Sequence, residues 1–455
     1  MFGHLDDPDG VSLGEAQMAA VLRRAHGISV RRRFATLAAV GLLIVAGGAG
    51  YVVSRQSTVR LSSAESGYQF NAEKGPLSLG TPVPTTALVN VVFDNAEEGF
   101  ALAAHRGEAV LAASTNGGST WQVQNDSLPA GYGQSDGYPG QFEFVGSDGY
   151  LWGGAPQADR SAPLWVSSDN GVRWDRAPIG PDVYDVSAIG ENVWALTSTC
   201  SAKALSTATA SCPLVLEQSL DGGASWSAVT SAGFADVTNA PLISQPVELA
   251  RITTSRAYVL TSNTGSPSAD VTGSDIELLY TGDGGQTWQS RPVPCAGPFA
   301  LGAEVAASGT DDLWFLCGSQ ASAGSQSKEL FRSSDGGLTW ASAASATGLG
   351  TPPPPASQPN GLPLVGYVAP FSIGHKNLAV ASPSTAWLYP TRASLFKTVT
   401  GGQSWVTVPE LSAAGFGSGS AGNVTFISAT QGWICAYGVG LWHTSDGVHW
   451  SPLGV

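Results

Sequence analysis

The sequence predicts an all-β protein, a seven-bladed β-propeller preceded by a single N-terminal transmembrane helix. Three observations lead to this prediction: a composition rich in turns and aromatics, one short phrase that recurs seven times, and one long uncharged segment near the N-terminus. Of 455 residues, 12% are charged and 14 are Trp, while Gly numbers 57 and Pro 28. Solvated helices need many Lys, Glu and Arg residues, so this composition argues against a coiled coil or a helical repeat.

Residues 34–53 read FATLAAVGLLIVAGGAGYVV, a run without a charge. A helix of that length spans roughly 30 Å, the thickness of the apolar core of a bilayer. Arg31, Arg32 and Arg33 precede it, and the positive-inside rule then leaves residues 1–33 in the cytoplasm. We therefore expect a single-pass protein of the cell membrane with an extracytoplasmic propeller. A cleaved signal peptide or a twin-arginine export signal stays an alternative, and either also places residues 54–455 outside the cytoplasm.

Residues 54–85 are polar and punctuated by Pro and Gly, which predicts a linker between membrane and propeller. The net charge of the chain is −14. An acidic domain repels phosphate backbones, so we expect no nucleic acid partner.

One phrase ending in Trp returns seven times, for example as SSDGGLTW at 333–340. Its Asp can close an Asx-type turn, its Gly residues supply the positive φ of a tight hairpin, and its Trp ring can pack against a sheet. The residues at the Asp position are Asn116, Asp169, Asp221, Asp283, Asp335, Thr400 and Asp446. The closing aromatics are Trp121, Trp174, Trp226, Trp288, Trp340, Trp405 and Trp450.

A strand-like run with its own aromatic precedes each phrase; these aromatics are Phe100, Trp152, Trp194, Tyr258, Trp314, Trp387 and Trp433. Each unit is predicted to be a meander of four strands, and seven such sheets can bury both faces when they pack radially. We predict blades at 86–129, 138–182, 183–236, 246–294, 298–345, 372–410 and 421–455. The ring is expected to close either by blade packing alone or by residues 66–90 adding a strand to the last blade.

These phrases resemble the Asp-box or BNR repeat of sialidases, sortilin-type receptors and the photosystem II assembly-factor family. The resemblance covers most of residues 86–455, although Asn116 and Thr400 replace the Asp and the last copy is one residue short. It implies that the Asp side chains are structural and lie away from the ligand-binding face. The insertions at 199–213, 263–275 and 347–370 are either segments in which binding function concentrates or plain surface loops, and the sequence leaves both open.

Five cysteines fit an oxidising compartment. Cys200, Cys212, Cys295 and Cys317 are candidates for two disulfides, whose pairing the sequence leaves open. Cys435 lies in an apolar run and is expected to be a buried free thiol. No metal-binding or cofactor-binding motif is present in the sequence, so we expect neither a metal nor a cofactor.

The resemblance to sialidases implies one possible chemistry, which needs an arginine triad, a Tyr nucleophile with a Glu, and an Asp acid/base. Sialidases are six-bladed and carry an Arg-Ile-Pro phrase early in the domain, whereas the nearest match here is Arg251-Ile252-Thr253 in mid-chain. The arginines available for a triad are Arg106, Arg160, Arg251, Arg256, Arg332 and Arg392. We therefore expect a non-catalytic scaffold for a protein partner; the alternative is a carbohydrate-binding protein or a sialidase-like glycoside hydrolase.

Overall fold

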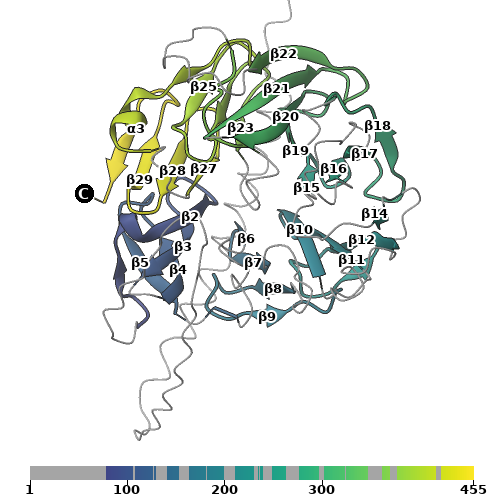
Figure 1. Cartoon of the computed structure of the whole chain (residues 1–455). Coiled ribbons are helices and arrows are strands. Elements are labelled where there is room, and N and C mark those ends of the chain that lie inside the picture. The colour runs from purple at the N-terminus through teal and green to yellow at the C-terminus, as the bar shows by residue number, and fades with distance from the viewer. Residues whose placement is uncertain are drawn as a thin grey trace, which may run out of the picture. The chain divides into compact units, whose positions relative to one another are not determined.

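The computed structural model describes residues 78–105, 108–126, 128–129, 141–152, 163–180, 182–198, 211–229, 234, 236–238, 248–262, 276–296, 302–322, 324–346, 361–368, 377–416 and 422–454. In this part of the chain, seven antiparallel sheets follow one another, each built on four strands that are consecutive in sequence. Figure 1 shows the sheets arranged in turn around a common centre. The seven-bladed all-β propeller that the sequence predicts is therefore confirmed.

Blade 1 consists of β2 (Leu88–Phe93), β3 (Gly99–His105), β4 (Glu108–Ser114) and β5 (Trp121–Asn125), preceded by β1 (Pro82–Val83) and the 3-10 turn η2 (Thr85–Ala87). Blade 2 consists of β6 (Gln141–Val145), β7 (Asp148–Trp152), β8 (Leu164–Ser167) and β9 (Asp175–Arg176). Blade 3 consists of β10 (Asp182–Ile189), β11 (Asn192–Ser198), β12 (Ser211–Ser219) and β13 (Ser227–Ala228), and β14 (Asp236–Thr238) pairs with β12. Blade 4 consists of β15 (Glu248–Arg251), β16 (Ala257–Ser262), β17 (Ile276–Thr281) and β18 (Gln289–Arg291).

Blade 5 consists of β19 (Gly302–Ala307), β20 (Leu313–Ser322), β21 (Ser325–Ser333) and β22 (Ala341–Ala346). Blade 6 consists of β23 (Leu378–Val380), β24 (Ala386–Leu388), β25 (Phe396–Thr398) and β26 (Val406–Thr407), followed by the short helix α3 (Pro409–Ala413). Blade 7 consists of β27 (Gly422–Phe426), β28 (Gly432–Ala436), β29 (Gly440–Thr444) and β30 (Ser451–Leu453).

The order of the strands gives the ring two different faces. Because neighbouring strands run antiparallel, the turns after the first and third strands of a blade lie at one end of its sheet. We call this end the repeat face, since the recurring phrases form the turns after the third strands. The turns after the second strands and the links between blades lie at the opposite face. The insertions at 199–213, 263–275 and 347–370 start and end at strands on that opposite face.

The core lies between the blades. One hydrophobic cluster joins Phe100 and Leu111 of blade 1 to Phe144 and Leu151 of blade 2. Equivalent clusters join each of the six remaining pairs of neighbouring blades, including blade 7 and blade 1. The second strands are largely buried, β24 and β28 at every residue, because they lie in mid-sheet with a blade on each side. Their sequences are therefore unbroken apolar runs and do not alternate.

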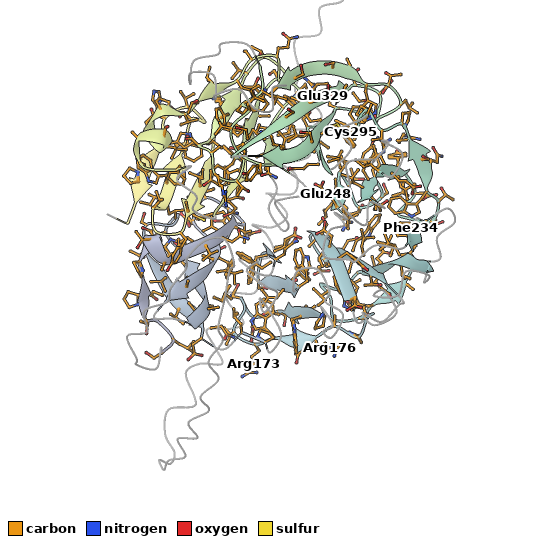
Figure 2. All side chains as sticks on the ribbon, viewed as in Figure 1. Arg173, Arg176, Phe234, Glu248, Cys295 and Glu329 are labelled. Carbon is orange, nitrogen blue, oxygen red and sulfur yellow. A yellow bond between two sulfur atoms is a disulfide. The ribbon has the colours of Figure 1, made fainter. Side chains whose placement is uncertain are left out.

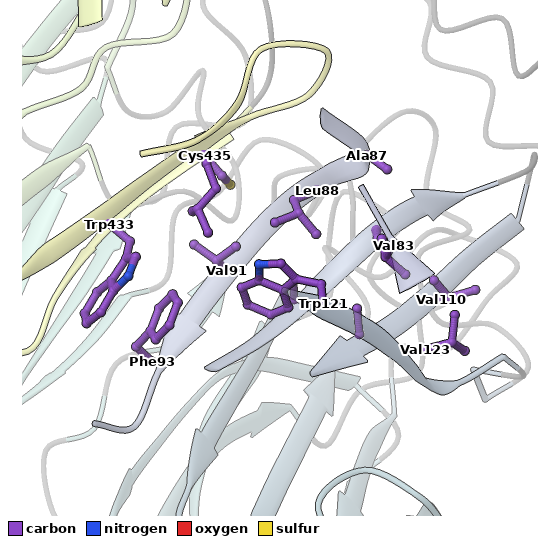
Figure 3. Packing of buried hydrophobic residues seen from close by; sticks show 14 residues of the cluster. Val83, Ala87, Leu88, Val91, Phe93, Val110, Trp121, Val123, Trp433 and Cys435 are labelled. Atoms are coloured by element: carbon purple, nitrogen blue, oxygen red, sulfur yellow. The ribbon is translucent and has the colours of Figure 1, made fainter. Parts of the chain in front are cut away.

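The ring closes between blade 7 and blade 1, as Figure 3 shows. The Phe93 ring stacks on Trp433 with a centroid separation of 3.8 Å. Asn423 adds two hydrogen bonds across the same seam: its Oδ1 accepts from Val91 N at 2.9 Å, and its Nδ2 donates to Val91 O at 2.7 Å. Side-chain packing and side-chain hydrogen bonds thus hold the two ends of the propeller together.

Strand β1 joins blade 1 and not the last blade. Pro82 lies opposite Gln122 and Val83 opposite Trp121, so β1 is an extra outer strand of blade 1. Of the two alternatives for ring closure, the addition of a strand to the last blade is therefore not found for the described residues 78–90, whose strands pair within blade 1. The reason is that the chain leaves β1 through η2, where Thr86 O accepts from Gly438 N of blade 7 without forming a ladder. This sheet also begins ahead of residue 86, inside the segment predicted as a linker.

The predicted transmembrane segment at 34–53 lies outside the described residues, as do residues 1–33. Among the described residues no helix has the length and apolar character needed to cross a bilayer.

We predict that Asn423→Ala destabilises the propeller by about 2 kcal/mol, because both hydrogen bonds to Val91 are lost at a closed seam. The free energy of unfolding in urea measures this. Gln286→Ala, at an exposed turn residue, is the control and should change stability by less than about 0.5 kcal/mol. Equal effects of the two substitutions would show that Asn423 does not hold the ring.

Candidate functional site

The seven recurring phrases form the hairpins between third and fourth strands, which we call the repeat hairpins. In blade 5, Ser333 Oγ donates to Asp335 Oδ1 at 2.7 Å and accepts from Gly337 N at 2.9 Å. Asp335 also accepts from Thr339, through the backbone N at 2.9 Å and through Oγ1 at 2.6 Å. The carboxylate is thus surrounded by donors of its own turn. These hydrogen bonds, above all those from Thr339, lower the pKa of Asp335 to about 2.

The two hairpins without Asp keep the same hydrogen bonds. Asn116 Oδ1 accepts from Ser114 Oγ and from Thr120 N, each at 3.0 Å. Thr400 Oγ1 accepts from Ser404 N at 3.0 Å. A short side chain with one acceptor oxygen is therefore enough to close the turn. The equivalent bonds in the other full-length hairpins are made by Asp169, Asp221 and Asp283.

The last hairpin compensates for its missing residue with a histidine. Asp446 Oδ1 accepts from Val448 N and His449 N, each at 2.8 Å, and Asp446 Oδ2 lies 2.7 Å from His449 Nδ1. The hydrogen bond with Asp446 raises the pKa of His449 above 6.5, and that with His449 lowers the pKa of Asp446 well below its usual range. His443 lies apart from this pair, with its ring 4.9 Å from Trp433.

Each repeat hairpin also contacts the preceding blade. A Cβ at Gly285 of blade 4 would collide with Leu216 of blade 3, and one at Gly402 of blade 6 would collide with Leu330 of blade 5. Both glycines have positive φ, 87° in each case, so their lack of a side chain serves the turn and the interface together.

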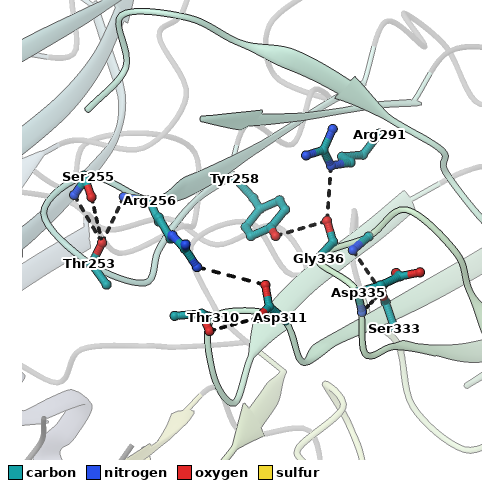
Figure 4. Close-up of polar contacts among 11 residues, drawn as sticks. Thr253, Ser255, Arg256, Tyr258, Arg291, Thr310, Asp311, Ser333, Asp335 and Gly336 are labelled. Carbon is teal, nitrogen blue, oxygen red and sulfur yellow. Dashed lines mark hydrogen bonds and ion pairs between the residues drawn. The ribbon is translucent and has the colours of Figure 1, made fainter. Parts of the chain in front are cut away.

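Hydrogen bonds reinforce these contacts between blades. Figure 4 shows the junction of blades 4 and 5, where Gly336 O accepts from Tyr258 Oη at 3.1 Å and from Arg291 Nε at 3.2 Å. Tyr150 donates to Gly222 O in the same way between blades 2 and 3. The pairing of Gly149 with Ser167, equivalent to Gly99 with Ser114, makes Tyr150 the counterpart of Phe100. Trp152, the aromatic assigned from the sequence, lies in the same strand but two residues past the equivalent position, because the strand holds two aromatics and only the pairing with β8 distinguishes them.

The closing tryptophans divide into two groups. Trp121, Trp288, Trp405 and Trp450 are buried, whereas Trp174, Trp226 and Trp340 are half-buried. Four indoles donate to a carbonyl of their own hairpin, as Trp121 Nε1 does to Gly118 O at 2.9 Å. Trp340 differs, since its Nε1 donates to Pro292 O at 2.8 Å.

A polar residue recurs at one position of the first strand in six blades and directly ahead of the first strand in blade 6, which we call the seam position. Its occupants are Asn90, Gln141, Asp185, Glu248, Glu304, Asn377 and Asn423. Four of these side chains accept from a backbone N–H of the next blade: Asp185 from Leu249 at 2.8 Å, Glu248 from Val305 at 3.1 Å, Glu304 from Leu378 at 2.8 Å, and Asn423 from Val91. Figure 2 shows Glu248 on the inner side of the ring.

Sequence reasoning missed the seam position, although a signal exists. In each blade an acidic or amide residue followed by an apolar residue stands nine or ten residues ahead of the second-strand aromatic. A single polar residue in a short apolar strand resembles the usual alternation of polar and apolar residues along a strand. Only its fixed spacing from the second-strand aromatic distinguishes it.

The arginines proposed for a sialidase triad have separate partners. Arg251 donates to Ser187 O at 2.9 Å and lies 4.3 Å above the ring of Trp194, and burial lowers its pKa to about 10. Arg256 is 4.0 Å from Asp311, and Arg332 is 3.9 Å from Asp312. Arg392 lies over Tyr367 at 5.6 Å. Arg106 and Arg160 are outside the described residues.

The structure describes the side chains of three of the five cysteines. Cys295 and Cys317 form a disulfide, which ties the link before blade 5 to strand β20. Cys435 is a free, buried thiol, as expected from the sequence. Cys200 and the side chain of Cys212 lie outside the described residues, so their pairing stays a prediction. The described residues contain no group of three or more His, Cys, Asp or Glu arranged to hold a metal ion.

The opposite face carries a buried lysine at the junction of blades 5 and 6. Lys328 is fully buried, and its Nζ lies within hydrogen-bond distance, 2.9 to 3.4 Å, of the backbone carbonyls of Gln326 and of residues 363–366, among which it shares its donors. Burial lowers its pKa to about 7. Gln326 adds a bond to Val368 N at 2.7 Å. Both side chains fix the end of the 347–370 insertion onto strand β21.

Comparisons with known proteins give distant similarities to solved structures. No protein-family model and no curated protein matches the chain. Among solved structures it is similar to YCF48 bound to a D1 peptide, with 16% identity and a TM-score of 0.47 over 83% of this chain and 99% of that one. It is also similar to YCF48 from Cyanidioschyzon merolae (13% identity, TM-score 0.46, covering 81% and 98%) and to a PL25 ulvan lyase (10% identity, TM-score 0.46, covering 82% and 95%). Similarities this distant carry no argument about function.

We predict that the Asp446–His449 pair makes the last hairpin sensitive to pH. A histidine whose folded pKa is raised stabilises the fold below its unfolded pKa, about 6.5, and this contribution is lost as pH rises through the raised value. The pKa of His449 from NMR titration should therefore exceed 6.5 and return to it in Asp446→Asn. An unshifted value in the wild-type chain would contradict the hydrogen bond.

Proposed function

We propose that this chain is a non-catalytic scaffold that binds a protein partner through its propeller, outside the cytoplasm, and is anchored by residues 34–53. The observation that carries the proposal is that the described charged side chains of the hairpins and of the seam position make hydrogen bonds that hold the fold together. The Asp carboxylates of the hairpins accept from their own turns, and seam carboxylates and Arg251 bond to neighbouring blades. Such bonds make a rigid ring suited to binding.

We further propose that the repeat hairpins are Asp-box repeats with a structural role. Their hydroxyl, Asp and Gly residues close the turn and touch the preceding blade, which supports this assignment. Ligand binding then falls to other parts of the ring, such as the opposite face with its insertions or the outer strands.

The alternative is a carbohydrate-binding protein or a sialidase-like glycoside hydrolase. A hydrolase of that kind requires three converging arginines beside a Tyr–Glu pair. The described members of the arginine set engage separate partners on blades 3 to 6, which favours the scaffold.

We predict that the tagged full chain, purified from detergent-solubilised membranes after cross-linking, carries a protein partner in stoichiometric amount. A chain with residues 1–77 fused to an unrelated domain is the control, because it keeps the proposed membrane segment and lacks the propeller. Absence of a partner together with specific binding on a glycan array would favour the carbohydrate alternative.

The proposed topology has a separate test. We predict that protease added to intact cells, after removal of any outer envelope, degrades the propeller, because residues 54–455 lie outside the cytoplasm. A tag before residue 1 should stay protected. Full protection of the propeller would overturn the orientation.

A further inference from the structure

The outer edge of blade 1 shows how an added strand binds to this fold. Val123 N donates to Thr81 O at 2.8 Å, and Val123 O accepts from Gly80 N at 2.9 Å. Val83 lies opposite Trp121, which is 2% exposed beneath it. The added segment is thus held by outward backbone groups of the outer strand and by an apolar contact on the closing tryptophan.

The outer edge of blade 5 has the same strand register, although the Trp340 indole donates to Pro292 O and not to its own hairpin. In blade 1 the register shifts between Leu111 and Ala112, and in blade 5 it shifts between Leu330 and Phe331, so both outer strands bulge three residues after their Trp. Trp340 is then the counterpart of Trp121, and Ser342 that of Val123. By this equivalence the N–H and C=O of Ser342 point away from the sheet.

The edge of blade 5 has no covering strand in the described part of the chain. The hydrogen bonds of the described residues include none from the outward groups of Ser342. Trp340 is half-buried where Trp121 is covered, and the neighbouring Leu338 is 55% exposed. Strand β22 lies on the outer rim of the ring (Figure 1).

The other outer strands are less suited to pairing. Strands β9, β13 and β26 have two residues, and β18 and β30 have three, whereas β22 has six. Charged residues occupy β9, with Asp175 and Arg176, and Figure 2 places Arg173 and Arg176 at the outer rim. Pro452 interrupts β30. Short length, charge and proline are the usual protections of a sheet edge, and β22, with the sequence ASAASA, has none of them.

We propose that β22 of blade 5 is a strand-addition site for an extended segment of a partner protein, with an apolar residue of that segment packed on Trp340. The inference rests on the proposed scaffold function and names the kind of partner. Because β22 has no charged side chain, the segment is recognised by its backbone and by this apolar contact. The chain's own segment at residues 80–83 is the pattern for the bound strand.

Ser342→Pro tests the site without threatening the fold. It removes the outward N–H, and blade 7 already holds Pro452 at the equivalent position, opposite Trp442 as Ser342 is opposite Phe331. Ser342→Ala keeps the N–H and is the conservative control. Ala228→Pro makes the same change on blade 3, where the outer strand has two residues.

The probe is a phage-displayed library of random nine-residue peptides, selected against the purified full chain. We expect enriched peptides with an apolar residue in an extended pattern. Their affinity, measured by fluorescence polarisation, should fall at least tenfold in Ser342→Pro and in Trp340→Ala. It should not change in Ser342→Ala or Ala228→Pro.

Two results would overturn the proposal: a library that yields no binder, or binders that Ser342→Pro does not affect. A dimer of the chain that Ser342→Pro dissociates, seen by analytical ultracentrifugation, would also overturn it by assigning the edge to a second copy. The scaffold function is tested separately. A partner captured from membranes by both the wild type and Ser342→Pro would support the scaffold function and reject this site.

Discussion

The hydrogen bond that a backbone N–H donates to a seam side chain of the preceding blade is the contact on which the ring depends. A first strand is an edge of its own sheet, and its inward backbone donors would lose their water where blades meet. Asp185, Glu248 and Glu304 supply the missing acceptors in three consecutive blades, and Asn423 does so where the ring closes. An amide can replace a carboxylate here because each bond needs one acceptor oxygen.

The repeat hairpins work at the outer part of the same interfaces. Their hydroxyl and Asp side chains bond within the turn, so the turn is rigid before it meets its neighbour. Their glycines then allow close approach to the preceding blade, and tyrosines such as Tyr258 bond to the exposed carbonyls. Hydrophobic clusters and outer hairpins therefore fix each junction, and inner polar bonds add a third contact at the junctions that Asp185, Glu248, Glu304 and Asn423 form.

The sequence predicts the parts of this design that are local and repeated. The hairpins depend on residues within eight positions, so their phrase identifies them and, by its count, the number of blades. The seam position was missed because its partner belongs to another blade, as was the role of Tyr150. The placing of β1 on blade 1 and the carbonyl cage around Lys328 depend on segments that meet only in the folded ring. No local pattern could reveal them.

The addition of β1 to blade 1 has a consequence for how the chain reaches its fold. A ring can also close when a strand from one terminus completes the sheet of the blade at the other terminus. In that arrangement the strand that is synthesised first cannot pair until the last blade has been made. Here all four core strands of every blade are contiguous in sequence. The strands of each blade can therefore pair without a segment from a later blade, each new blade packs on the one made before it, and the junction between Asn423 and Val91 is left to the final step.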